Sequence, residues 1–187
     1  MELQFDKYSC RCLKKLNAHT QSQELTQEIR IPDNMPDVGR VLGCWGQPLL
    51  RGKEWSSGGV NINGGVTAWV MYVPEGGGVP QSVGLWLPFQ MKWNLTDAQS
   101  DGTISAVMDL ANMDCRSLSA RKLMVRVTVS AVVDAWEPSQ VELYQAGQLG
   151  EDIQLLENTY PMELPQEAGE KPFQMEEELN IPGFTDG

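Results

Sequence analysis

The alternation of apolar and polar residues between Leu123 and Trp136 is the feature that most constrains the fold. Valine or alanine occupies every second position from Val125 onward, and polar residues such as Arg126 and Thr128 lie between them. Successive side chains of a strand point to opposite faces, so this pattern predicts a strand with one buried and one solvated face. Such a strand needs a second layer over its apolar face. The chain is therefore expected to consist of packed antiparallel sheets.

Several other runs indicate strands separated by turns. Val83 to Trp93 also alternates, and Pro88 on its polar side predicts an edge strand or a bulge, because proline cannot donate to a central ladder. Trp45, Trp69 and Trp93 are expected on apolar faces, packed in the core. Short strands joined by turns favour an antiparallel β-sandwich or a barrel-like module. Turn signals occur at residues 57–59, 63–65, 75–78, 101–102 and 117–120.

Helical signals are few. Residues 138–144 are predicted to form a short helix, and the segment from Lys7 to Leu16 has some amphipathic character. Beyond residue 137, prolines punctuate an acidic stretch, which predicts a connector up to residue 172. The expected fold is thus all-β, with short helical segments and an acidic C-terminal extension.

The charge balance excludes some classes of partner. The 187 residues carry a formal net charge of -11, and acidic residues concentrate between Glu137 and Gly187. Binding to nucleic acid or anionic lipid needs clustered Lys and Arg, so neither is expected. No apolar run approaches the roughly 20 residues that span a bilayer, and no signal peptide opens the sequence. The protein is therefore expected to be cytoplasmic, without an integral membrane segment.

Side chains for catalysis or metal binding are scarce. His19 is the only histidine, and its polar surroundings predict a solvated residue rather than a member of a catalytic triad. Cys10 and Cys12 lack the Cys-x-x-Cys spacing of zinc sites, and all four cysteines, with Cys44 and Cys115, are expected to be reduced, mostly buried thiols. No phosphate-binding loop is present. We expect a protein that is not an enzyme and has no catalytic residue, metal or cofactor, with carboxylates brought together by the fold as the open alternative.

A compact Pro/Asp segment lies between two apolar runs. The residues predicted to form a structural turn motif are Ile31, Pro32, Asp33, Pro36 and Asp37. Asp33 and Asp37 lie four positions apart and in principle offer two carboxylates to a cation. Because histidines and metal-ligand spacing are missing, the favoured role is structural, with the carboxylates capping the turn through hydrogen bonds to backbone N–H groups.

An internal repeat links this region to the C-terminus. Residues 25–32 align without gaps on residues 175–182, at an offset of 150 (175 − 25), with identical Glu, Ile and Pro. A repeat of this period suggests one module followed by the first strand of another. The repeat does not continue beyond Pro182. Residues 173–187 are therefore expected to begin a second module that is cut short, or to pair back onto the first.

Tryptophans on polar faces are the remaining recognition signal. Trp86 and Trp136 fall on the more polar faces of their strands, and Arg126 lies on the face of its strand that does not carry the valines. Aromatic residues and arginine are enriched at protein interfaces, so these three residues are the predicted interaction surface. Coverage of the rings by a neighbouring segment is the alternative.

The segment from Thr26 to Leu42, TQEIRIPDNMPDVGRVL, resembles the opening signature of the SPOCS domain family, which is named from spore-coat assembly proteins of endospore-forming bacteria. The similarity continues through residues 59–66, 70–73 and 126–133, within residues 24–137. The resemblance implies a non-catalytic module, often present in tandem copies, that helps to build or anchor the coat on the developing spore. A LysM-like segment, found in some members, is absent, so wall-glycan binding is not implied.

Together these patterns predict an organisation and a function. The expected parts are an N-terminal arm (1–23), a SPOCS-like β module (24–137), a connector (138–172) and a C-terminal segment (173–187). The expected function is that of a structural module in a spore-coat or spore-envelope assembly protein. Its expected partners are other coat or morphogenetic proteins at the surface of the developing spore, in the mother-cell cytoplasm, with self-association left open. The alternative is a β-sandwich that binds carbohydrate or peptide through exposed tryptophans.

Overall fold

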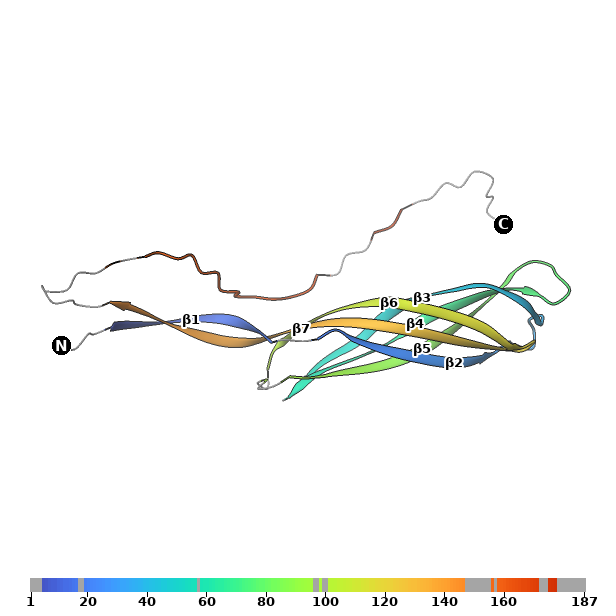
Figure 1. Ribbon diagram of the computed structural model, residues 1–187, viewed down its shortest axis with the longest axis horizontal. Coiled ribbons are helices and arrows are strands. Elements are labelled where there is room, and N and C mark those ends of the chain that lie inside the picture. Colours follow the sequence, from blue (N-terminus) through green and yellow to red (C-terminus); the bar gives the residue numbers. More distant parts are fainter. Residues whose placement is uncertain are drawn as a thin grey trace, which may run out of the picture.

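The computed structural model describes residues 5–16, 19–56, 58–95, 98, 101–146, 156, 158–171 and 175–177. These residues form seven β-strands and no helix (Figure 1). Each pairing between strands is antiparallel, as the alternation predicted. In chain order the strands are β1 (Phe5–Leu16), β2 (Gln21–Arg30), β3 (Val38–Ser56), β4 (Gly59–Pro74), β5 (Gln81–Asn94), β6 (Thr103–Ser119) and β7 (Lys122–Ala146).

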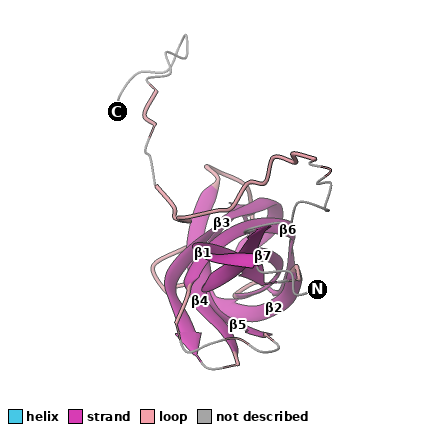
Figure 2. Cartoon of the chain, turned by 90° about the vertical axis from the view of Figure 1, so that its left-hand side faces the viewer, coloured by secondary structure: helices cyan, strands magenta, loops and turns pink. Residues whose placement is uncertain are grey.

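The strands form two sheets that are not closed into a barrel (Figure 2). Sheet B has the order β3–β4–β5, so β5 with its Pro88 is an edge strand, as predicted. In sheet A, β7 is central. Ala131 pairs with both β2 and β6, and Ala135 pairs with both β1 and β6. Hence β1 and β2 follow each other along one edge of β7, and β6 lies along the other.

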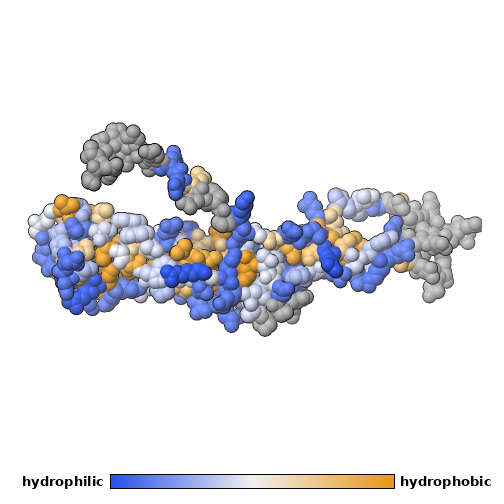
Figure 3. All heavy atoms as spheres, turned by 180° about the vertical axis from the view of Figure 1, so that it is seen from behind, coloured by the Kyte–Doolittle hydropathy of each residue, from blue (hydrophilic) through white to orange (hydrophobic). Residues whose placement is uncertain are grey.

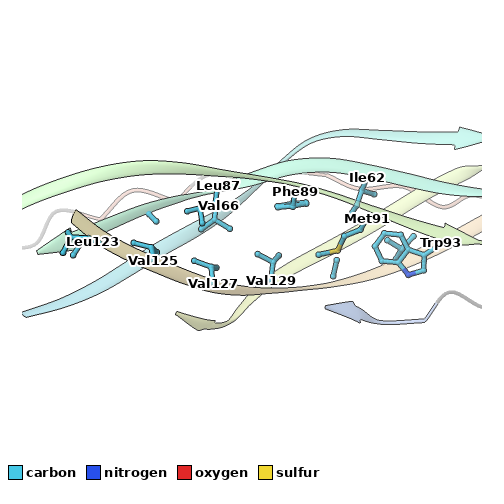
Figure 4. Close-up of a cluster of buried hydrophobic side chains, with 14 of the residues drawn as sticks. Ile62, Val66, Leu87, Phe89, Met91, Trp93, Leu123, Val125, Val127 and Val129 are labelled. Atoms are coloured by element: carbon cyan, nitrogen blue, oxygen red, sulfur yellow. The ribbon is translucent and has the colours of Figure 1, made fainter. Parts of the chain in front are cut away.

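One hydrophobic core joins the two sheets. The odd-numbered residues of β7 from Leu123 to Ala135 are completely buried, which confirms the predicted two-faced strand. They face apolar side chains of β4 and β5, among them Leu87 and Phe89 (Figure 4). Full burial of one such side chain stabilises the fold by about 1.5–3 kcal/mol. The two sheets are therefore held together by the alternating residues of their central strands.

Both predicted helices are strands instead. Residues 7–16 belong to β1 and residues 138–144 to β7, and the two segments pair with each other, with Cys10 opposite Val141. Local periodicity could not reveal this, because each segment finds its hydrogen-bonding partner far away in the sequence. As a result β7 continues to Ala146, through the first nine residues (138–146) of the predicted connector.

One predicted turn is also wrong. Asn63, Gly64 and Gly65 lie within β4 and pair with both β3 and β5. The two glycines are needed for space rather than for a turn. A Cβ on Gly64 would lie 2.2 Å from the carbonyl oxygen of Leu49, and a Cβ on Gly65 would lie 2.2 Å from the Trp86 ring. The predicted turns that do connect strands include the one at Gly58, between β3 and β4, and residues 75–78, between β4 and β5.

The tryptophans are distributed differently from the prediction. Trp93 lies in the core, 2% exposed, but Trp45 and Trp69 do not. These two pair in register on β3 and β4 and lie on the outer face of sheet B, where Trp45 is 44% exposed. The inward-facing residues of this part of β4 are even-numbered, such as Val70, so Trp69 must point outward.

The strand β1 and the end of β7 extend beyond the two-layer body as a two-stranded ribbon (Figure 1). We call residues 5–16 and 135–146 the projecting ribbon. Pairing between β6 and β7 ends where Thr103 meets Trp136, so β6 does not accompany the ribbon further. Apolar side chains, interrupted by hydrophilic ones, gather on the body and reach along the ribbon (Figure 3). Beyond Trp136, therefore, neither outer edge of the ribbon is paired with another described strand.

Within the described ranges, no helix is long and apolar enough to cross a membrane. The predicted N-terminal arm, residues 1–23, contains β1 and the start of β2. The predicted C-terminal segment, residues 173–187, lies outside the described residues except for 175–177.

Candidate interaction surfaces

Arg121 organises the Pro/Asp turn that carries the chain from β2 to β3, and so from one sheet to the other. Its Nη1 donates hydrogen bonds to the Met35 carbonyl at 2.9 Å and to Asp37 at 2.7 Å. Its Nη2 donates to the carbonyl oxygens of Pro32 at 2.8 Å and Ile31 at 3.3 Å. A guanidinium group presents five N–H donors in one plane, which suits several acceptors on one turn.

The two aspartates of the turn also contact this arginine. Arg121 Nη2 lies 3.4 Å from Asp33. The hydrogen bond to Asp37 is the main cause that raises the pKa of Arg121, and the charge of Asp33 adds to it. The carboxylates thus accept hydrogen bonds from an arginine side chain, whereas the sequence predicted that they would accept them from backbone N–H groups of the turn. Across the described residues, no group of three or more His, Cys, Asp or Glu is arranged to hold a metal ion.

Further bonds fasten the turn to both sheets. The Val38 N–H donates to the Ala120 carbonyl at 2.8 Å. The hydroxyl of Tyr72, a completely buried residue of β4, donates to the Pro36 carbonyl at 2.9 Å, and desolvation raises the pKa of Tyr72. Arg121 could not be recognised from the sequence, because an arginine in a hairpin turn resembles any solvated surface residue. Its role depends on the meeting of two turns that are distant in the sequence.

The outer edge of β1 presents backbone donors. The Leu13 N–H points away from β7, because it donates to the Pro165 carbonyl at 2.7 Å. The β1–β7 register has no shift, so the N–H groups of other odd-numbered residues, including Ser9 and Arg11, also point outward. These two N–H groups have no backbone partner among the described residues. An unpaired row of this kind can accept an additional strand.

The outer edge of β7 in the ribbon is less open. Pro138 lies opposite Leu13, in a pair that exchanges no hydrogen bonds. The backbone nitrogen of Pro138 therefore faces the outer edge, where proline supplies no N–H donor. The next residue with an outward N–H on this strand is Gln140, and the one after it is Glu142. Proline and charged residues on an edge discourage unselective strand pairing. The β1 edge also carries charged residues, Lys7 and Arg11, but it contains no proline and so keeps all its backbone donors.

Aromatic and charged side chains accompany the open edge. Phe5, Tyr8 and Tyr144 are each more than half exposed. Lys7 pairs with Glu142 at 2.5 Å across the ribbon, and its hydrogen bond is the main cause that lowers the pKa of Glu142. Tyrosine combines a large apolar ring with a polar tip and is enriched at protein interfaces. The ribbon thus combines backbone donors with side chains suited to binding another protein.

A C-terminal segment, which we call the strap (residues 163–170), runs along the ribbon toward the body (Figure 1). At the ribbon, the Pro165 carbonyl accepts the hydrogen bond from Leu13, and the Gln166 side chain donates to the Arg11 carbonyl at 2.9 Å. Both contacts use outward-facing backbone groups of β1. The strap therefore occupies one end of the open edge and shows that this edge accepts an extended segment.

Glu170 anchors the other end of the strap. It lies 2.5 Å from Lys53 Nζ and accepts a hydrogen bond from the Ala106 N–H at 2.6 Å, and these contacts lower its pKa. Because the folded pKa lies below the ordinary value of 4.5, the anchor is present above that value and is lost as the pH falls through the lowered value. We expect Glu170→Gln to speed amide exchange at Leu13 about two- to fivefold at neutral pH.

The exchange rate of the Leu13 N–H is measured by hydrogen–deuterium exchange with NMR detection. Glu167→Gln is the matched control, since it removes the same charge from the strap at an exposed residue. It should leave the Leu13 rate unchanged. Equal rates in wild type and Glu170→Gln would show that the strap does not depend on this anchor.

The three residues of the predicted interaction surface do not form one surface. Trp86 lies on sheet B, whereas Arg126 and Trp136 lie on β7, ten positions or about 33 Å apart. The Arg51 guanidinium lies 4.2 Å from the centroid of the Trp86 ring, and Lys15 Nζ lies 5.3 Å from that of Trp136. Each ring is therefore covered on one face by a cation of its own chain.

Comparison with known proteins identifies no relative, since no family model, no curated protein and no solved structure matches the chain. A function must therefore be inferred from the positions and contacts of the ribbon, the strap and the Pro/Asp turn.

Proposed function

We propose that the chain is a non-catalytic structural module of a spore-coat or spore-envelope assembly protein. It acts through protein–protein contacts at the surface of the developing spore, in the mother-cell cytoplasm. The setting is supported by the resemblance of residues 26–42 to the SPOCS signature. The mode of action is supported by one observation above the others, the open β1 edge of the projecting ribbon.

In this proposal the body is a β-sandwich that holds the ribbon away from itself. The shared core fixes β7 along its first half, and the second half of the same strand supports β1. Because one continuous strand spans body and ribbon, a partner bound at β1 is connected to the core through the backbone of β7. That is a useful property for a building block, and it needs no catalytic group.

The partner is another coat or morphogenetic protein that adds an extended segment to β1. Backbone hydrogen bonds to Ser9 and Arg11 would supply affinity, and the exposed rings of Phe5 and Tyr8 would supply side-chain contacts. The strap already uses the neighbouring groups of Arg11 and Leu13 in this way. The repeat of residues 25–32 at 175–182 in the sequence fits a protein built from tandem modules.

A localisation experiment tests this function. The full chain, fused to a fluorescent protein, is produced in the mother cell of a sporulating endospore-former. We expect a ring or cap of fluorescence at the developing spore, while the fluorescent protein alone stays dispersed. Dispersed fluorescence from an intact, folded fusion would contradict the proposed function.

A further inference from the structure

Two cysteines lie on strands that form neighbouring edges of the two sheets. Cys44 belongs to β3, an edge strand of sheet B, and Cys115 belongs to β6, an edge strand of sheet A. Both side chains are half-buried and pack against the same hydrophobic core. The Cα atoms of β3 and β6 approach within 8 Å of each other. The two thiols therefore belong to one seam between the sheets.

Contacts along this seam fix how the two strands run. A Cβ on Gly46 of β3 would lie 3.3 Å from the sulfur of Met113 of β6. Further along, Lys53 of β3 donates to the Ile104 carbonyl of β6 at 3.0 Å. Residue numbers thus rise along β3 while they fall along β6, so the strands are antiparallel across the seam.

The same relation brings the cysteines opposite each other. Cys44 lies two residues before Gly46, and Cys115 lies two residues after Met113. Because the strands are antiparallel, both cysteines are displaced from the Gly46–Met113 contact by the same distance and in the same direction along the seam. No bulge interrupts either strand between these positions. Steps of two residues keep the side chains on the inward face. Cys44 should therefore face Cys115, next to the contact between Gly46 and Met113.

The electrostatics of the two thiols agree with this placement. Desolvation raises the pKa of Cys115 to about 11, with the neighbouring Cys44 as the next cause. Desolvation also raises the pKa of Cys44, and the charge of Asp114 adds to the effect. Both groups are therefore protonated thiols at neutral pH. Since the thiolate is the reactive form, any oxidation should be slow at neutral pH and faster as the pH rises.

We propose that Cys44 and Cys115 form a disulfide that links the two sheets when the protein is exposed to a disulfide-forming oxidant. Each thiol loses its proton and one electron as the S–S bond forms. The oxidant, a small-molecule disulfide or an azo compound such as diamide, takes up two protons and two electrons. The bond would close a loop of 72 residues (115 − 44 + 1) and bind β3 to β6 covalently. Because long loops gain most from closure, the oxidised protein should melt at a higher temperature.

The other two cysteines provide an internal comparison. Cys10 and Cys12 lie on the ribbon, on the same strand and two residues apart. Extended backbone places their Cα atoms about 6.6 Å apart with parallel side chains, a poor geometry for a disulfide. Oxidation of the folded chain should therefore leave these two thiols free.

The test treats the folded, full-length protein with diamide, alkylates the remaining thiols under denaturing conditions, and digests with trypsin. The expected product joins the peptides 41–51 and 93–116, which contain Cys44 and Cys115, with a mass lower than their sum by two hydrogen atoms. The melting temperature should rise by several degrees, and reduction should reverse both changes. Cys10 and Cys12 should be recovered fully alkylated.

Two variants control the test. In Cys44→Ser, Cys115 should stay reduced and the melting temperature should not respond to diamide. A mixture of unlabelled and ¹⁵N-labelled protein distinguishes links within one chain from links between chains. Full alkylation of Cys44 and Cys115 after oxidation, links between chains, or links to Cys10 or Cys12 would each overturn the inference.

Discussion

Replacement of Arg121 by alanine is expected to lower the melting temperature by roughly 5 °C or more. The substitution removes the donors for three carbonyl oxygens of the Pro/Asp turn, those of Ile31, Pro32 and Met35, together with the ion pair to Asp37. The acceptors of Ile31 and Met35 are partly buried, so leaving them without partners is costly, and they belong to the segment that crosses between the sheets. Thermal unfolding followed by circular dichroism measures the effect.

Arg126→Ala is the matched control for this variant. It removes the same kind of side chain from β7, the strand that follows Arg121, but among the described residues Arg126 forms an exposed ion pair with Glu24 at 3.6 Å and no other contact of this kind. Its melting temperature should stay within about 1 °C of wild type. Arg121→Lys should fall between the two, because lysine keeps the charge but lacks the planar fork. If Arg121→Ala and Arg126→Ala have the same melting temperature, Arg121 does not organise the Pro/Asp turn as described.

Proline at position 9 is expected to abolish recruitment to the spore surface while leaving the fold intact. The Ser9 N–H points to the open edge, so Ser9→Pro removes a donor that no described backbone group uses. Proline also obstructs an incoming strand. The fluorescent fusion carrying Ser9→Pro should therefore disperse in the mother cell, and its melting temperature should fall by no more than about 2 °C.

Cys10→Pro is the contrasting variant. The N–H of Cys10 points toward β7, where Cys10 pairs with Val141, so proline there breaks the ribbon itself. We expect a loss of about 1 kcal/mol or more from the missing hydrogen bond and the strain beside it. Normal recruitment of Ser9→Pro, with a folded protein, would show that the β1 edge is not the contact element.

The alternation of valines predicted the core strand correctly, because a strand with one buried face shows that face in its own period of two. From Leu123 to Ala135 every odd-numbered residue is buried. Pro88 likewise predicted an edge strand or a bulge, since the missing donor restricts proline wherever it occurs, and β5 is an edge strand. Features of this kind follow from the chemistry of a single segment.

Features that depend on two distant segments could not be predicted from the sequence. Residues 138–144 form a strand because β1 pairs with them, and Gly65 lies within a strand because the Trp86 ring covers it. Arg121 gains its role only when the β6–β7 turn meets the Pro/Asp turn. The open edge of β1 is likewise a consequence of topology rather than of composition. The predicted surface of Trp86, Trp136 and Arg126 used the polar faces of single strands, which do not show how two sheets are placed, and its members lie apart.

Residue-resolved amide exchange on β1, before and after assembly, tests the central claim most directly. In the isolated protein the N–H groups of Tyr8 and Cys10, which point toward β7, should exchange slowly, and those of Ser9 and Arg11 should exchange fast. On binding to a coat partner, the Ser9 and Arg11 groups should become protected by a factor of at least about ten, because they enter hydrogen bonds with the added strand. A bound complex in which both groups still exchange at the rate of the free protein would contradict assembly through the β1 edge.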